Sequence, residues 1–278
     1  SILVFAVISL PWWSGRIEHF DYQFIAISLI PLNLSLKYIK VKKFQLLDYI
    51  AISIVGLASP YIFIFGLLTA GISFIGVNFL YRFNRKQILE QVLINLVPLI
   101  TFLASFYLFS LKFINPYPGL KRNISEAVHL SGYFFLPFVP MPNTKIPGLD
   151  SSFAHLKIDQ SLTETTWLSN YGNIFVSVCT LLAFISIFRI IFFRKTIQEI
   201  PNLKLIQLLA TLILSYLIIF TKGGGGTVIS LWLPQIRSWN RLTPLIQMAI
   251  IILGILILDN YQRQKRQFIK IIIYITVY

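Results

Sequence analysis

The chain has few of the residues that soluble proteins place on their surfaces. Only 12% of its 278 residues are charged, whereas 56% are hydrophobic and 15% are aromatic. A soluble fold of this size would need far more polar surface, and apolar runs of about 20 residues recur throughout. We therefore expect an all-α, polytopic transmembrane helical bundle of eight to nine spans, with a long extracytoplasmic loop.

Cysteine is almost missing. The single Cys179 lies in an apolar run and excludes an internal disulfide. The sequence has no CxxC motif and no Cys/His spacing typical of a metal site. We assign no metal ligands on spacing, and although a divalent metal stays open as a cofactor, the sequence does not identify one.

Acidic residues are also scarce, with 10 Asp and Glu against 24 Lys and Arg, a net charge of +14. Such a charge can indicate nucleic-acid binding, but here the cations form short clusters between apolar runs. Clusters of this kind are typical of membrane topology signals. We therefore expect membrane lipid as a partner and no nucleic acid.

The apolar runs define the expected spans and three regions. Because the last run stops at the final residue and the first is short and lacks a signal peptide, we expect a piece of a longer protein. The regions are a first helix group (1–113), a Pro-rich extracytoplasmic loop (114–172) and a second helix group (173–278) with an outer loop at 221–241. The expected spans are 1–13, 20–36, 44–58, 60–81, 88–113, 173–193, 204–221, 242–260 and an incomplete 268–278.

Basic clusters predict the orientation. Of the 24 Lys and Arg residues, 15 belong to four clusters near 37–43, 82–86, 189–204 and 263–270, and 8 lie in the opposite loops. The positive-inside rule places the four clusters in the cytoplasm. This orientation requires 44–81 to be a helical hairpin, broken at Ser59 because the residue before a proline disfavours helix.

The opposite face then carries all three histidines and six of the ten acids. In the turn SGRIEHFDYQ (14–23), Glu18 and His19 are candidates for a general base or metal ligand. The alternative is a hydrated turn neutralised by Arg16. Glu164, close to the end of the long loop, is a third candidate acid.

The stretch TKGGGGTVISLWLPQIRSWNRLTP (221–244) is the second feature of that face. Its glycines are not a P-loop, because no GK[ST] follows. They predict either a flexible connector or a turn that lets VISLWLP fold back. Arg237 and Arg241, with Trp239 nearby, could bind a lipid phosphate and stack on a ring or isoprenoid unit. The alternative is an interfacial aromatic belt with snorkelling arginines.

Several motifs together resemble a family. SGRIEHFDYQFIAISLIPL, SGYFFLPFVPMPNTKIPGL, TETTWLSNYGNIF and LPQIRSWNRLTPLI are similar, in this order, to motifs of large bacterial sugar-translocase and phosphoglycerol-transferase-like membrane proteins related to GT-C glycosyltransferases. The resemblance covers roughly residues 10–260, and PQIRSWNR is its most distinctive motif. It implies a transferase of the bacterial inner membrane that uses a polyprenyl-phosphate-linked sugar donor at the outer face. It marks His19, Glu164, Arg237, Asn240 and Arg241.

One departure from this pattern affects the catalytic assignment. GT-C enzymes usually hold a catalytic acid in their first outer loop, and the chain is expected to begin after that loop. The alternatives are a transporter or flippase of lipid-linked glycans, which usually places charges or broken helices at mid-membrane, and a structural subunit without chemistry.

Overall fold

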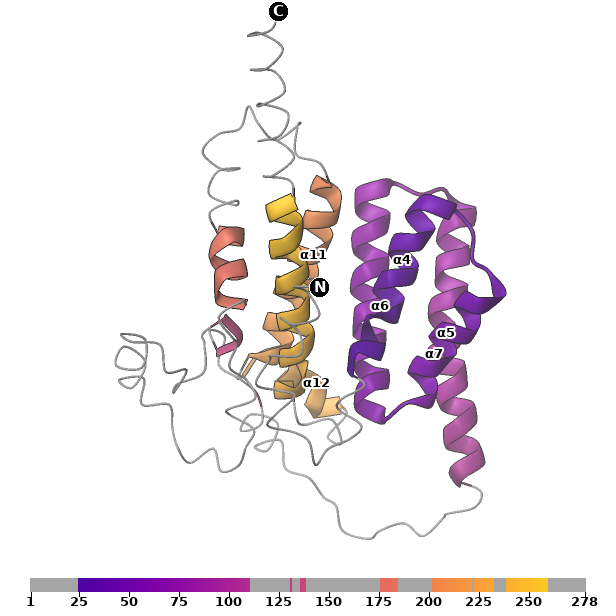
Figure 1. Cartoon of the computed structure of the whole chain (residues 1–278). Coiled ribbons are helices and arrows are strands. Elements are labelled where there is room, and N and C mark those ends of the chain that lie inside the picture. The colour runs from indigo at the N-terminus through magenta and orange to yellow at the C-terminus, as the bar shows by residue number, and fades with distance from the viewer. Residues whose placement is uncertain are drawn as a thin grey trace, which may run out of the picture.

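The computed structural model of the chain describes residues 25–110, 131, 136–138, 176–184, 202–221, 223–232 and 239–259. Every regular element in these ranges is a helix, which confirms the all-α class. Figure 1 shows most of the long helices running side by side along one direction.

Most helices of the first group begin and end close to the predicted boundaries. It comprises η1 (Ile25–Leu29), α4 (Ile30–Val41), α5 (Leu46–Leu57), α6 (Pro60–Tyr81) and α7 (Arg85–Ser110). The predicted end of the span 20–36 was wrong, since α4 continues to Val41 with Lys40 in its last turn. Cations are favourable there because the carbonyl end of a helix carries partial negative charge.

The break between α5 and α6 is confirmed. Ala58 and Ser59 are extended, and Pro60 is the first residue of α6. Proline lacks an N–H and keeps the preceding residue out of the helical region, so one long helix is divided into a hairpin.

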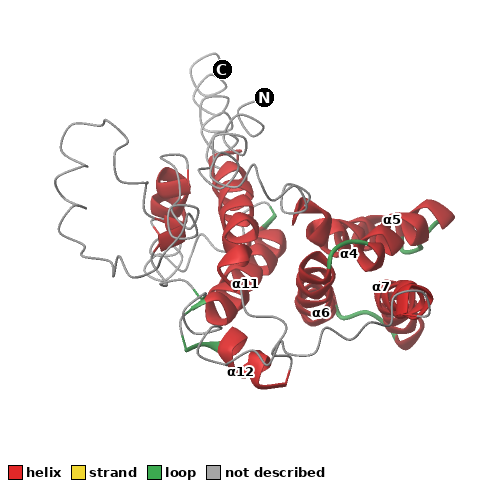
Figure 2. Cartoon of the chain, turned by 90° about the horizontal axis from the view of Figure 1, so that it is seen from below, coloured by secondary structure: helices red, strands yellow, loops and turns green. Residues whose placement is uncertain are grey.

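The second group packs against α6. It contains a helix at 176–184, α11 (Leu203–Phe220), α12 (Gly225–Trp232), η5 (Trp239–Leu242) and the helix Thr243–Asp259. The short η2 (Leu136–Phe138) joins this group through a 2.9 Å hydrogen bond from Ser177 Oγ to the Phe138 carbonyl. Figure 2 shows α6 between α7 and the second group, and a buried hydrogen bond between Thr69 and Tyr216 links α6 to α11.

Two apolar cores hold the described helices together. The larger core lies where η1, α4 and α6 meet α11, η5, the helix at 176–184 and the helix Thr243–Asp259; Phe65, Leu212 and Ile246 are buried there. The smaller core lies between α4, α5 and α7 and consists of Leu34, Ile52, Val55 and Ile94.

Three described helices are long and apolar enough to cross a membrane: Pro60–Tyr81, Arg85–Leu108 and Leu203–Phe220. The predicted count of eight to nine spans is not confirmed. The predicted span at 44–58 corresponds to α5, whose 12 residues rise only about 18 Å against a hydrocarbon core of about 30 Å. The predicted spans at 1–13 and 268–278 lie outside the described residues.

Large apolar side chains cover much of the outer surface of these helices. Phe79 on α6 is 82% exposed, and only 17% of the most apolar 18-residue stretch of α7 is buried. Water would make such a surface costly, whereas lipid hydrocarbon would not. The surface therefore agrees with the length and composition of the three helices in indicating a membrane protein.

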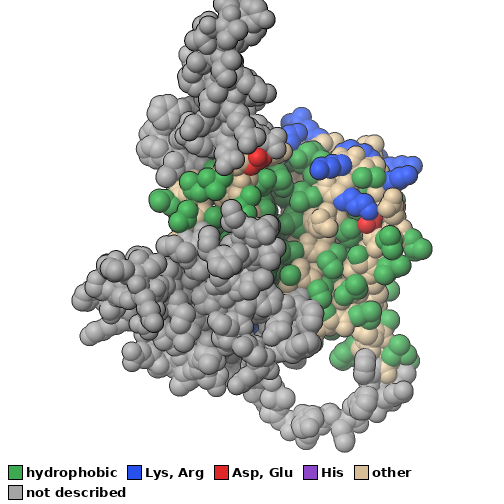
Figure 3. Space-filling view, in the orientation of Figure 1, with side chains coloured by type: hydrophobic (Ala, Val, Ile, Leu, Met, Phe, Trp, Pro, Cys, Tyr) green, Lys and Arg blue, Asp and Glu red, His purple; other side chains and the backbone are tan. Residues whose placement is uncertain are grey.

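The basic clusters at 37–43 and 82–86 and Lys204 of a third cluster meet at one end of the bundle, which we call the basic end. The Lys42 ammonium lies 4.1 Å from the centre of the Phe83 ring, and the Lys204 ammonium lies 4.7 Å from that of Tyr81. Figure 3 shows Lys and Arg side chains gathered at this end of the first helix group. The clustering follows the prediction, while the assignment of this end to the cytoplasm stays a prediction.

Candidate functional site

Three of the seven predicted site residues fall in η5. Trp239 and Arg241 are described with their side chains, and Asn240 is described by its backbone only. The remaining four lie outside the described residues: Glu18, His19, Glu164 and Arg237. The structure therefore describes two of the seven predicted side chains, those of Trp239 and Arg241, and does not test the catalytic assignments.

The glycine run allows the chain to fold back against α11. α11 ends at Phe220, Gly223 takes a positive φ of 75°, and α12 begins at Gly225. A Cβ at Gly226 would lie 2.5 Å from the Ile219 carbonyl oxygen and 2.5 Å from ring atoms of Trp239. Only glycine allows α12 to come this close to both, so these residues have a packing role that a flexible connector would not need.

Trp239 is the largest fully buried side chain among the described residues. Its Nε1–H donates a 2.8 Å hydrogen bond to Ser230 Oγ, and the Ser230 hydroxyl donates to the Gly226 carbonyl at 2.9 Å. Its ring centre lies 6.2 Å from that of Phe65 on α6. Because an unsatisfied buried N–H costs about 1–3 kcal/mol, Ser230 fixes the indole against α12. The role of Trp239 in ligand binding stays a prediction, and the observed contacts are those of a packed core residue.

Arg241 lies two residues further along η5 and is half-buried. The guanidinium carbon lies 4.0 Å from the centre of the Tyr61 ring, and Nε is shielded from solvent. Tyr61 stands in the first turn of α6, so Arg241 joins the second helix group to the first. A guanidinium stacked on an aromatic face keeps its charge and its planar set of N–H donors, which suits phosphate or carboxylate binding.

Arg241 lies at the end of the bundle away from the basic end. Tyr61 follows the α5–α6 turn, and η5 contacts α11, whose last turn carries the start of α12. Figure 1 shows α12 at this end. We call it the arginine end. The two ends therefore separate Arg241 from the described basic residues, as the topology prediction requires.

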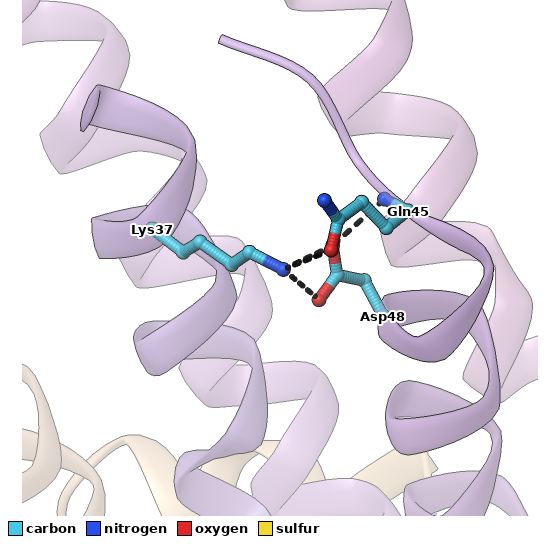
Figure 4. Close-up of polar contacts among 3 residues, drawn as sticks. All are labelled: Lys37, Gln45 and Asp48. Atoms are coloured by element: carbon cyan, nitrogen blue, oxygen red, sulfur yellow. Dashed lines mark hydrogen bonds and ion pairs between the residues drawn. The ribbon is translucent and has the colours of Figure 1, made fainter. Parts of the chain in front are cut away.

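Asp48, at the basic end, is bound by α4. Lys37 Nζ donates to its two carboxylate oxygens at 2.7 and 2.9 Å, and to Gln45 Oε1 at 3.4 Å (Figure 4). The Gln45 backbone N–H donates to Asp48 Oδ2 at 2.8 Å and completes a capping box at the start of α5. Burial raises the pKa of the Asp48 carboxyl, but the hydrogen bonds from Lys37 and Gln45 and the Lys37 charge outweigh burial and lower it below its ordinary value.

Glu90, near the start of α7, also accepts a hydrogen bond from a side chain of α4. The Tyr38 hydroxyl donates a 2.6 Å hydrogen bond to Glu90 Oε2 and ties α4 to α7. Burial, followed by the bond and charge of Glu90, raises the pKa of Tyr38. The sequence did not predict either partner, because residues 11 and 52 positions apart in the chain give no local pairing signal.

No group of three or more His, Cys, Asp or Glu side chains that could hold a metal occurs within the described ranges. Cys179 is buried and free. The Arg241 guanidinium is the described candidate for anion binding, and that role stays a prediction. No family model, curated protein or solved structure matches this chain.

Proposed function

We propose that this chain is part of an integral membrane glycosyltransferase of GT-C type. It would transfer a sugar from a polyprenyl-phosphate-linked donor to an acceptor hydroxyl at the outer face of the bacterial inner membrane. The observation that carries the proposal is Arg241. Its guanidinium is held on Tyr61 at the arginine end of the bundle, opposite the basic end.

The position of Arg241 suits a lipid phosphate for a physical reason. A phosphate at the headgroup level of a bilayer lies in a medium that screens charge less than bulk water does. A guanidinium with its orientation fixed by a ring can bind phosphate oxygens with little loss of side-chain freedom. Arg237, four residues earlier, would supply the second guanidinium.

In the proposed reaction, a carboxylate or imidazole accepts the proton of the acceptor hydroxyl, and the oxygen attacks the anomeric carbon of the donor. The bond from that carbon to the phosphate oxygen breaks, and polyprenyl phosphate leaves. Glu18, His19 and Glu164 are the candidates for the base. Arg237 and Arg241 would stabilise the negative charge that grows on the departing phosphate.

The charges of the described spans support a transferase over a transporter of the same lipid. α6 contains no Asp, Glu, Lys or Arg, α7 carries these residues only up to Glu90, and α11 has only Lys204 near its start. Transporters usually place charged groups near mid-membrane. Within the described residues, charge is instead confined to the ends.

The test compares Arg237→Lys and Arg241→Lys with wild type. Lysine keeps the charge but loses the planar fork, so we expect the affinity for a short-chain polyprenyl phosphate to fall about ten-fold or more. Tyr61→Leu, which removes the stacking ring, should weaken binding in the same direction. In the full-length protein, sugar transfer should fall in parallel.

Arg194→Lys, an arginine of a predicted cytoplasmic cluster, is the matched control and should bind as wild type does. The proposal is wrong if both arginine variants of the site keep wild-type affinity and turnover. The arginines would then be interfacial anchors, because either cation can snorkel.

A further inference from the structure

An apolar hollow of about 160 Å³ lies on the surface between α6 and α7. It is lined by Ala70, Gly71 and Phe74 from α6 and by Val92, Asn95 and Leu96 from α7. Gly71 and Leu96 are exposed, so the hollow opens outward. No atom lies within 4 Å of the position that a Cβ at Gly71 would occupy, so the missing side chain keeps the hollow open.

The line of contact between α6 and α7, which we call the seam, continues from the hollow to the basic end. Two arginines lie there. Arg82 belongs to the short connection between α6 and α7, and Arg85 is the first residue of α7. Both are exposed, and the described residues provide no ion-pair partner for either. Residues seven apart share a face of a helix, so Arg85 lies on the same stripe of α7 as Val92.

The spacing along this stripe matches the shape of a lipid. Arg85 and Leu96 are separated by a rise of about 16 Å along α7. Leu89, which is 58% exposed, lies between them on the same face. On the inner side, the seam is closed by a 3.4 Å contact from Asn78 Nδ2 to Gln91 Oε1, which keeps the path on the surface.

We propose that this seam binds one anionic phospholipid of the surrounding bilayer. Its phosphate contacts Arg82 and Arg85, and one acyl chain fills the hollow beside Gly71. The cations at one end and the apolar cavity further along complement a molecule with an anionic head and a hydrocarbon tail. Guanidiniums pair with phosphate oxygens, and an apolar hollow gains free energy when hydrocarbon fills it.

The headgroup arginines of this site lie at the opposite end of the bundle from Arg241, and the site does not depend on the proposed transfer reaction. The experiment reconstitutes the chain in phosphatidylcholine nanodiscs that contain phosphatidylglycerol with a photoreactive group in one acyl chain. After irradiation, mass spectrometry locates the labelled peptides. We expect labelling at residues 70–74 and 92–96, reduced by unlabelled phosphatidylglycerol but not by added phosphatidylcholine.

Two variants test the headgroup half and the acyl-chain half of the site separately, and a third serves as a control. Arg82→Gln with Arg85→Gln should reduce labelling at least about five-fold, the effect expected for one cation near an anionic lipid. The matched control, Lys40→Gln with Lys43→Gln, removes equal charge from the α4–α5 side of the basic end and should leave labelling unchanged. Gly71→Leu should displace the label from the hollow without disturbing the protein, because nothing lies where its Cβ would be.

Two results would overturn the proposal. Equal loss of labelling in the arginine and lysine pairs would show a diffuse attraction of the basic end for anionic lipid. Labelling by phosphatidylcholine that matches labelling by phosphatidylglycerol would show an acyl groove without headgroup recognition. Circular dichroism of each variant in the same nanodiscs confirms that the helices are retained.

Discussion

At the residue scale, the partners of a charged side chain decide what it can do. Asp48 lies 2.7 Å from the Lys37 ammonium and caps its own helix, so it joins two helices. Arg241 stacks on the Tyr61 ring at the opposite end, where the role we propose for its guanidinium is to bind a phosphate. Residue type alone does not separate these roles, because both side chains are charges next to apolar helices.

The Asp48 contact predicts a dependence of stability on pH. The pKa of its carboxyl is lowered in the folded chain, so its contribution is complete above the ordinary carboxyl pKa of about 4. It is lost as pH falls through the lower, folded pKa. In detergent, the thermal stability of wild type should therefore decrease below about pH 4 more steeply than that of Asp48→Asn.

Lys37→Met gives the complementary result. It removes the cation that holds the buried carboxylate charged, so the variant should be destabilised at neutral pH. That deficit should shrink as pH falls and Asp48 becomes protonated. Parallel pH profiles for wild type and Asp48→Asn would contradict the assigned contact.

At the element scale, α12 shows how a short helix can depend on one close approach. Eight residues are too few for a stable helix by themselves, so tertiary contacts must hold α12 in place. Those contacts are the last turn of α11 and the buried indole of Trp239. α12 in turn fixes the start of η5, which carries Arg241.

Two neighbouring glycines give a matched test of this packing. Gly226→Ala would place a methyl group against the Ile219 carbonyl and the Trp239 ring. We expect a loss of about 1–3 kcal/mol of stability from overpacking and a weaker affinity at Arg241. Gly225→Ala would meet its nearest atom at 3.5 Å, an ordinary contact, and should be close to neutral. Thermal unfolding in detergent measures both variants, and equal stabilities would show that α12 is not tightly packed there.

At the scale of the whole molecule, charge and aromatic anchoring separate two ends. Lys42, the residue after α4, and Lys204 of α11 pack over Phe83 and Tyr81 at the basic end, whereas the α5–α6 turn and η5 form the arginine end. Long apolar helices connect the two. A lipid bilayer would leave both ends at its surfaces and surround the apolar sides.

Cysteine labelling in intact cells tests the orientation. In a Cys179→Ala background, a membrane-impermeant maleimide should label Lys145→Cys and Trp232→Cys but not Lys42→Cys. Permeabilised cells should show labelling of Lys42→Cys as well, which controls for reactivity. Labelling of Lys42→Cys without Lys145→Cys in intact cells would reverse the topology.

Much of the helical layout followed from hydropathy. α6 and α11 lie within one residue of the predicted ranges. The apolar run of α6 begins at Pro60 and stops before Arg82, and that of α11 begins beside Lys204, so the sequence marks these boundaries. The span count did not follow, since α5 is apolar but only 12 residues long. Hydropathy measures how apolar a segment is, whereas the length of a helix depends on where the backbone leaves the helical conformation.

Local composition and backbone sterics were enough to predict the helical class, the break before Pro60 and the position of cations at helix ends. The burial of Trp239, its contact with Gly226 and the stacking of Arg241 on Tyr61 became known only from the packed helices. These contacts join residues from separate helices, and such pairings depend on how the helices pack, which hydrophobic pattern does not encode.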